Sequence, residues 1–107
     1  MSGVGRLRHR LVLEMPLTTP DGAGGVTLTW SSVATVWANV LAQTGREATQ
    51  FDRFSGTSTH RVVLRFRSDV SPEMRFRTGQ RLLHIVSVRD VEGRRRWLEC
   101  ACEEEFL

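Results

Sequence analysis

The chain has 107 residues, of which 40% are hydrophobic and 25% charged, with a formal net charge of +3. This length predicts one domain, residues 1–107, with a single core and little apolar surface to spare. No segment approaches the roughly 20 apolar residues of a membrane-spanning helix, and the N-terminus lacks the apolar stretch of a secretory signal, so we expect no membrane association and synthesis in a reducing cytoplasm.

The first part of the chain alternates apolar and polar side chains with the period of β-strands. Residues 7–15 predict a strand that Pro16 ends, because proline cannot donate to a ladder. Residues 18–25 contain three glycines and predict a flexible loop, across which residues 26–31 could return as the second strand of a hairpin. Residues 33–41 predict a third strand that is apolar on both faces, as in the interior of a barrel or sandwich.

Residues 43–58 break this rhythm. Phe51 and Phe54 lie three positions apart, which fits a short amphipathic helix over residues 46–54. The alternative is a mobile loop, and structureless loops of more than about 12–15 residues are often functional or disordered.

Residues 59–67 show the clearest alternation in the chain and predict a further strand. One face is expected to carry His60, Val62, Leu64 and Phe66, and the other Arg61, Val63, Arg65 and Arg67. The first face is suited to a core and the second to a partner.

The last third predicts one turn and two more strands. Ser71 and Pro72 have the residue types of the cap and first position of a single helical turn over residues 71–74. Residues 80–89 and 96–103 alternate as strands, joined by a hairpin turn at residues 90–93 in which Gly93 can take a positive φ. The acidic residues 103–105 are expected to form an exposed tail. Together these elements predict an all-β fold: a small antiparallel β-barrel or sandwich of about six strands, with long loops and at most one short helix.

The sequence shows none of the residue patterns that catalysis requires, such as a nucleophile with its base, an HExxH motif or a phosphate-binding loop. The histidines are scattered, and His60 and His84 lie in register with apolar neighbours, as core or rim residues do. Cys100 and Cys102 share one face of a strand at the limit of disulfide geometry and predict buried, unreactive thiols. We therefore expect no enzyme, no metal site and no cofactor.

All fifteen basic residues are arginine, and they cluster near the N-terminus, in residues 61–67 and in residues 89–96. Arginine favours permanent polar interfaces and polyanions, although a GC-rich genome would give the same bias. The arginine faces carry no interleaved aromatic side chains, and no helix is available for a major groove, so sequence-specific DNA recognition is not expected. Contact with a DNA backbone, or pairing with carboxylates of neighbouring subunits, remains open.

Six segments, in order, carry a resemblance to a known family: residues 5–10 (GRLRHR), Trp30 with residues 33–38 (VATVWA), and residues 45–47 (GRE), 59–62 (THRV), 67–70 (RSDV) and 93–99 (GRRRWLE). Their order, their spacing and the chain length resemble the phage head–tail joining family. These are the head-closure or stopper proteins of long-tailed phages, prophages and gene transfer agents. The resemblance implies a small β-barrel with long loops, in agreement with the strand pattern.

The resemblance also implies a structural virion component at the neck of the particle, without enzymatic activity. It would form a homo-oligomeric ring between the portal and its adaptor above and the tail terminator or tail tube below. Double-stranded DNA would pass through this ring without sequence specificity. In some members the loop between the second and third barrel strands projects into the channel and holds the DNA, and residues 43–58 occupy that position. The candidate channel residues are Gly45, Arg46, Glu47, Gln50, Asp52 and Arg53. The candidate contacts with a neighbouring subunit or the adaptor are Arg8, Arg10, Arg61, Arg65, Arg67, Arg94 and Arg95.

Two alternatives remain open from the sequence. The chain could be a free-standing nucleic-acid-binding barrel, which predicts tight DNA binding with a steep salt dependence. It could also be a tail terminator or another neck protein of similar size.

Overall fold

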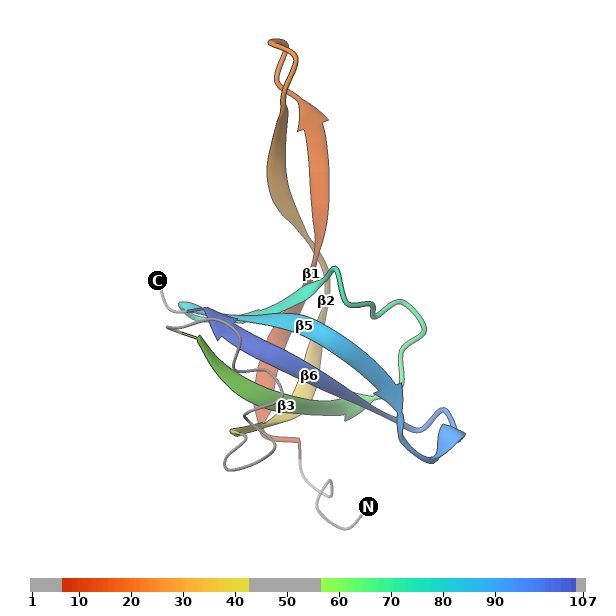
Figure 1. Ribbon diagram of the computed structural model, residues 1–107. Coiled ribbons are helices and arrows are strands. Elements are labelled where there is room, and N and C mark those ends of the chain that lie inside the picture. The colour runs from red at the N-terminus through yellow and green to blue at the C-terminus, as the bar shows by residue number, and fades with distance from the viewer. Residues whose placement is uncertain (1–6, 43–56, 106–107) are drawn as a thin grey trace.

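A computed structural model describes residues 7–42 and 57–105. Six antiparallel strands close into a barrel in the order β1-β2-β3-β6-β5-β4, and β4 pairs with β1 to complete the ring. The strands are β1 (His9–Pro20), β2 (Val26–Ala42), β3 (Thr57–Arg65), β4 (Arg75–Thr78), β5 (Arg81–Asp90) and β6 (Trp97–Glu105) (Figure 1). The prediction of an all-β fold, a small antiparallel barrel or sandwich of about six strands, is confirmed, and the closed ring makes it the barrel.

The barrel interior is filled by the inward-facing residues of the alternating strands. Phe76 of β4 is the largest fully buried side chain, and the core cluster around it is made of Leu11, Leu13, Val36, Ala38, Val62, Leu64, Met74, Leu83, Ile85, Leu98, Cys100 and Cys102. The expected apolar face of β3 is thus confirmed at Val62 and Leu64. Both cysteines are buried and unbonded to each other. Burial, with a smaller contribution from the charge of Glu99, raises the pKa of Cys100 to about 12.

The structure has six strands, but they are not the six that the sequence predicts. The two strands expected at residues 26–31 and 33–41 form one continuous strand, β2. A bulge explains the interrupted pattern: Leu13 pairs with Ala34 and Glu14 with Ser32, so Val33 is the extra residue. The short strand β4 was not predicted because its four residues include a single apolar one, Phe76.

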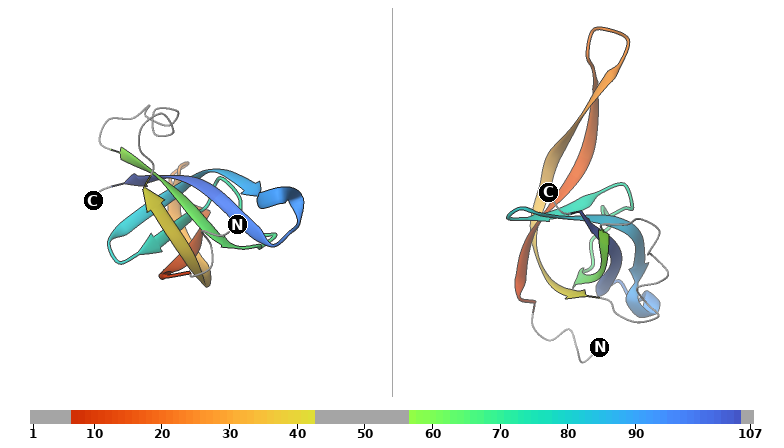
Figure 2. Two further views of the ribbon diagram at one scale, coloured as in Figure 1. Left: turned by 90° about the horizontal axis from the view of Figure 1, so that it is seen from below. Right: turned by 60° about the vertical axis from the view of Figure 1, so that its left-hand side comes forward.

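The paired ends of β1 and β2 project from the barrel as a two-stranded ribbon, here called the arm and comprising residues 15–33 (Figures 1 and 2). Pro16 does not end β1, contrary to the prediction. Beyond Glu14 the outer edge of β1 has no β4 partner, and proline is tolerated on such an edge. The expected loop of residues 18–25 shrinks to a tight turn, in which the Asp21 side chain accepts hydrogen bonds from the backbone N–H of Ala23 and Gly25.

The boundaries of the remaining elements differ from the predicted ones by a few residues. β3 begins and ends two residues earlier than expected, and residues 71–74 form a hydrogen-bonded turn without an assigned helix. Gly93 takes the expected positive φ, within a 3₁₀ turn at Val91–Gly93 (η2). The acidic residues 103–105 are not an exposed tail but the last residues of β6.

Glu104 points into the end of the barrel and is only 4% exposed, because the alternation that buries Cys100 and Cys102 turns it inward as well. Arg81 donates two hydrogen bonds to its carboxylate, at 2.8 and 2.9 Å, and His60 lies 3.4 Å away. The hydrogen bonds from Arg81 hold the pKa of Glu104 below its ordinary value despite burial. This end of the barrel is therefore closed by a polar cluster centred on Glu104, in which His60 is the core or rim histidine that the sequence predicts.

Candidate functional site

The seven arginines expected at an interface lie in three parts of the structure. Arg8 and Arg10 lie at the start of β1, and Arg94 and Arg95 lie in the connection between β5 and β6. The remaining three, Arg61, Arg65 and Arg67, lie in or directly after β3. All six candidate channel residues lie outside the residues that the structure describes.

Three of the seven arginines are paired with carboxylates of their own chain. Arg61 lies 3.3 Å from Glu99, whose other oxygen accepts from Arg89 at 3.0 Å, and Arg94 lies 3.7 Å from Glu92. Arg67 donates two hydrogen bonds to Asp69, at 3.0 and 2.9 Å, which lower the pKa of that carboxyl. Such half-exposed pairs contribute little to stability. Each of these three arginines is nevertheless already paired with a carboxylate of its own subunit.

Arg65 has a different environment, in which its contact is with a tryptophan. Its guanidinium carbon lies 5.4 Å from the centroid of the Trp97 ring, in the neighbouring strand β6. On its other side, the pairing of Leu64 with Ala38 places Arg65 beside Trp37 of β2, and Trp37 in turn pairs with Arg10 of β1. An outward-facing row therefore crosses four strands in the order Arg10, Trp37, Arg65, Trp97; we call it the Arg–Trp row.

The Arg–Trp row corrects the expectation that no aromatic side chains interleave with the arginines. The tryptophans do not alternate with the arginines along the same strand; they lie on adjacent strands. Among the described residues, neither Arg10 nor Arg65 has a carboxylate partner within ion-pair distance. The Trp37 side chain is 54% exposed, which is unusual for so large an apolar group.

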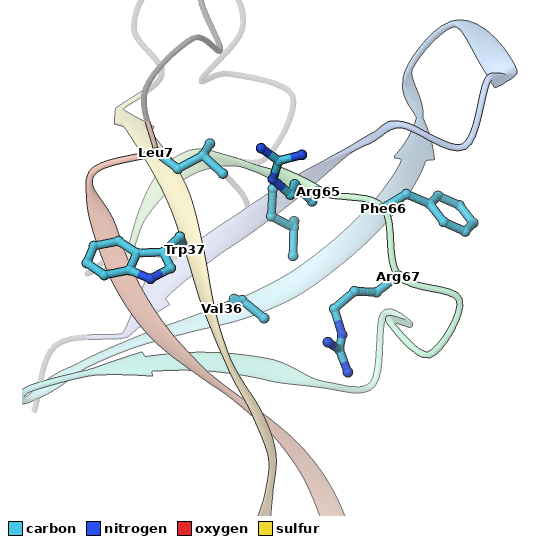
Figure 3. Close-up of a pocket in the computed structure, with 7 residues that line it drawn as sticks. Leu7, Val36, Trp37, Arg65, Phe66 and Arg67 are labelled. Carbon is cyan, nitrogen blue, oxygen red and sulfur yellow. The ribbon is translucent and has the colours of Figure 1, made fainter.

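A shallow cavity of about 260 Å³ adjoins this row (Figure 3). Its lining residues are Leu7, Val36, Trp37, Leu64, Arg65, Phe66 and Arg67. The set contains apolar, aromatic and cationic groups but no nucleophile and no base. Such a lining can bind apolar or anionic groups, and it offers no route to acid–base or nucleophilic chemistry.

The described residues contain no group of three or more His, Cys, Asp or Glu side chains arranged to hold a metal ion. Each histidine has its own separate contact: the Nδ1 of His9 accepts from the backbone N–H of Val40, His60 contacts Glu104, and His84 contacts Glu105 at 2.7 Å. In the part of the chain that the structure describes, no helix has the length and apolarity to cross a membrane.

A second cluster, at the base of the arm, was missed by the sequence reasoning. Glu14 is buried and accepts hydrogen bonds from Arg75 at 2.7 Å and from Arg77 at 2.9 Å. The guanidinium of Arg75 also stacks on Trp30, whose ring meets His84 edge-on at 6.1 Å between centroids. Burial alone would raise the pKa of Glu14, but hydrogen bonds from Arg77 and Arg75 hold it below its ordinary value.

This cluster, here called the arm clamp (Glu14, Trp30, Arg75 and Arg77), joins the arm to the barrel wall. The sequence contains one signal for this cluster. Glu14 on β1, and Arg75 and Arg77 on β4, alternate with core residues and therefore lie on the outer face of their strands. Their partners could not be identified because β4 was not predicted, and β4 lies about sixty positions further along the chain.

The family described as phage head completion protein matches residues 3–105. A chain in the structure titled "Virion of native gene transfer agent (GTA) particle" is 31% identical, with a TM-score of 0.67, over 94% of this chain and 96% of that one. The solution structure of protein SF1141 from Shigella flexneri 2a is also 31% identical, with a TM-score of 0.71, over 94% of each chain. No curated protein matches the sequence.

Proposed function

Since this chain belongs to the phage head completion protein family, we propose that it forms a ring at the neck of a virion or gene transfer agent particle. The family gives it a structural role in joining head to tail. The ring, placed between the portal and adaptor above and the tail terminator or tail tube below, is the finer part of the proposal. The observation that carries it is the likeness, over nearly the whole length of both chains, to a component of a gene transfer agent particle.

The site geometry supports a binding role over a catalytic one. The Arg–Trp row and the apolar arm expose large side chains on the described surface, and neither contains a nucleophile or a general base. Both are suited to contacts with proteins, because aromatic and arginine side chains are enriched at interface cores. We therefore infer that the protein acts by assembly and catalyses no reaction.

Deletion of the protein from a particle-producing strain tests the head–tail role. Negative-stain microscopy is expected to show filled heads and free tails in place of joined particles. Expression of the wild-type chain from a plasmid should restore joining. Joined particles at wild-type frequency in the deletion strain would refute the proposal.

The proposed contribution to DNA retention is a separate question, and it concerns Gly45, Arg46, Glu47, Gln50, Asp52 and Arg53. Replacement of residues 45–53 by a Gly-Ser linker of equal length should leave heads joined to tails but lower the DNA content of each particle. The measurement is nuclease-protected DNA per particle. Unchanged DNA content would remove these residues from the retention mechanism while leaving the joining role intact.

A free-standing nucleic-acid-binding barrel is the second candidate, and the exposed Trp37 beside Arg10 and Arg65 is the observation in its favour. Against it, the face of Trp97 is already covered by the Arg65 guanidinium, so that ring is not free to stack on a base. This candidate predicts tight binding of short single-stranded DNA that weakens steeply between 50 and 200 mM salt, by a factor of roughly 300 for six phosphate contacts. A neck subunit on its own should bind such DNA only weakly.

A further inference from the structure

Five of the eight exposed large hydrophobic residues in the described part of the chain lie in the arm. Over residues 15–33 its single charged side chain is Asp21 at the tip. Val26 is 68% and Leu28 is 55% exposed, and Met15, Leu17 and Val33 are exposed as well. Contiguous apolar surface of this kind marks an interaction site in a soluble protein.

Neither strand of the arm has a second neighbour among the described residues. β4 pairs with β1 only from Val12 to Glu14, and β3 pairs with β2 only from Ala38 onward. The six pairs from Met15–Ser31 to Pro20–Val26 therefore stand alone, reaching roughly 20 Å from the barrel at about 3.3 Å per residue. A two-stranded ribbon is marginally stable in water without further packing, so the arm requires a partner surface to cover it.

One face of the arm is the more apolar. The pairs Pro20–Val26, Thr18–Leu28 and Pro16–Trp30 follow one another along that face, because alternate pairs of a ladder point to the same side. The other face carries Thr27 and Thr29 of β2 beside Thr19 and Leu17 of β1. The arm clamp holds Trp30 at the base of the first face, so this face is presented in a defined direction.

A complementary surface lies at the other end of the same two strands. Trp37, Asn39 and Leu41 alternate outward along β2, and Leu41 is 46% exposed. Arg8, directly before β1, and Arg10 of β1 lie beside them, and Arg65 at the end of β3 lines the same cavity as Trp37. This Trp37–Leu41 surface combines exposed apolar groups with cations that have no carboxylate partner among the described residues, while the arm combines apolar groups with one anion.

A single copy cannot bring the two surfaces together. The arm and the Trp37–Leu41 surface are opposite ends of the continuous strands β1 and β2, and the arm clamp fixes the arm to the barrel wall (Figures 1 and 2). The occupant must therefore come from another molecule. A second copy of this chain supplies the matching apolar surface and the opposite charge.

We propose that the arm of one copy docks through Val26 and Leu28 on the Trp37–Leu41 surface of a second copy, with Asp21 beside Arg10 or Arg65. Two different surfaces meet in this contact, so it is heterologous and repeats from copy to copy, closing into a ring if the rotation allows. The proposal rests on the ring of the proposed function and names the surfaces that build it.

Sedimentation velocity of the purified protein over a range of concentrations tests this contact with two variants and two controls. Leu28→Glu places a charge on the apolar face of the arm, and Trp37→Glu places a charge on the Trp37–Leu41 surface to which the arm would bind. Thr27→Glu places the same charge on the other face of the arm, and Val86→Glu places it on exposed β5. Wild type and both controls are expected to self-associate alike, and each variant to associate about 30-fold more weakly or not at all. Matching circular dichroism spectra and melting temperatures would confirm that the variants fold.

Mixing the two variants makes the test specific for a heterologous contact. An equimolar mixture of L28E and W37E retains one intact contact, between the arm of W37E and the surface of L28E. It should form dimers that grow no further. A wild-type protein that stays monomeric at the highest concentration, or a W37E that associates like wild type, would overturn the proposal.

Other occupants of either surface would appear as distinct outcomes. If L28E self-associates normally but leaves heads and tails apart in particles, the arm binds another neck protein and the proposal is wrong. If W37E self-associates normally but loses binding to short DNA, the surface serves nucleic acid, and the proposal is again wrong. Failure of the proposed function is distinguishable, because it is measured by joined particles in the deletion strain and not by self-association.

Discussion

The guanidinium of Arg75 lies 4.0 Å from the centroid of the Trp30 ring, so that a residue of β4 covers a residue of the arm. The same guanidinium donates a 2.7 Å hydrogen bond to Glu14, the last residue of β1 before the arm begins. A single side chain thus holds both strands of the hairpin at the point where they leave the barrel. This contact sets the direction of the arm, since the strand pairs beyond it have no further strand neighbour among the described residues.

Arg75→Ala is expected to destabilise the protein by about 1–3 kcal/mol, because it removes a charge-assisted hydrogen bond and leaves buried Glu14 with Arg77 alone. Urea denaturation measures the free energy of unfolding. Arg89→Ala is the matched control, since Arg89 also pairs with a carboxylate, Glu99, but is exposed. Its loss should cost less than about 1 kcal/mol. Equal losses for the two variants would contradict the role of the arm clamp.

The stability of the protein should fall in acid through Glu14 and Glu104. The pKa of each is lowered in the folded state, by hydrogen bonds from Arg77 and Arg75 to Glu14 and from Arg81 to Glu104. A lowered pKa means that the unfolded chain binds more protons over the interval below the ordinary value of 4.5. The stabilisation is therefore complete above that value and is lost as the pH falls through the folded-state pKa.

Glu104→Gln tests this pH dependence. The free energy of unfolding of the variant, followed by chemical denaturation between pH 7 and pH 3, should change less steeply with pH than that of wild type. Glu73→Gln is the control, because Glu73 lies on the surface and accepts a hydrogen bond only from the Ser71 hydroxyl among the described residues. A pH profile of E104Q parallel to that of wild type would show that Glu104 does not contribute.

Cys100 and Cys102 should resist alkylation in the folded protein. Burial raises the pKa of the Cys100 thiol from 9.0 to about 12 and that of Cys102 well above its ordinary value. Since the thiolate is the reactive form, three pH units correspond to a rate on the order of 10³-fold lower, before access is considered. Iodoacetamide labelling followed by mass spectrometry should show almost no modification at pH 8, and complete modification of both residues in guanidinium. Rapid labelling of the native protein would mean that the core opens readily.

Charge reversal at Arg65 should impair the joining of heads to tails while leaving the subunit folded. Arg65 has no carboxylate partner among the described residues and lies over Trp97 on the exposed face of the barrel, so R65E removes a cation that is available to a partner. The measurements are the fraction of joined particles and the melting temperature, with Gln80→Glu as an exposed control. Normal joining by R65E would exclude this face from the interface.

Arg67 requires a different test because it already forms an ion pair with Asp69. R67E alone should impair joining through repulsion from Asp69 as well as through any lost contact. The double variant R67E/D69R restores the pair within the subunit with its charges exchanged. Recovery of joining by the double variant would assign Arg67 a local structural role, whereas continued failure would place it at the interface.

The alternation of side chains along each strand was sufficient to predict the fold class and much of the core. Val62, Leu64, Cys100 and Cys102 were recognised as core residues because a strand turns successive residues to opposite faces, which is a local property of the backbone. The order of short segments was sufficient for the family resemblance, and the match over residues 3–105 confirms it.

The environment of each charged residue depended on neighbours that are distant in the chain. Strand register places Trp97 beside Arg65, turns Glu104 inward to Arg81, and brings Arg75 onto Trp30. The length of the arm likewise follows from where β3 and β4 stop pairing, and not from the residues of the arm, which misleadingly include Pro16 and Pro20. The sequence thus specifies which face of a strand a residue occupies. Pairing between strands is a non-local interaction, and it determines which residues of other strands that side chain contacts.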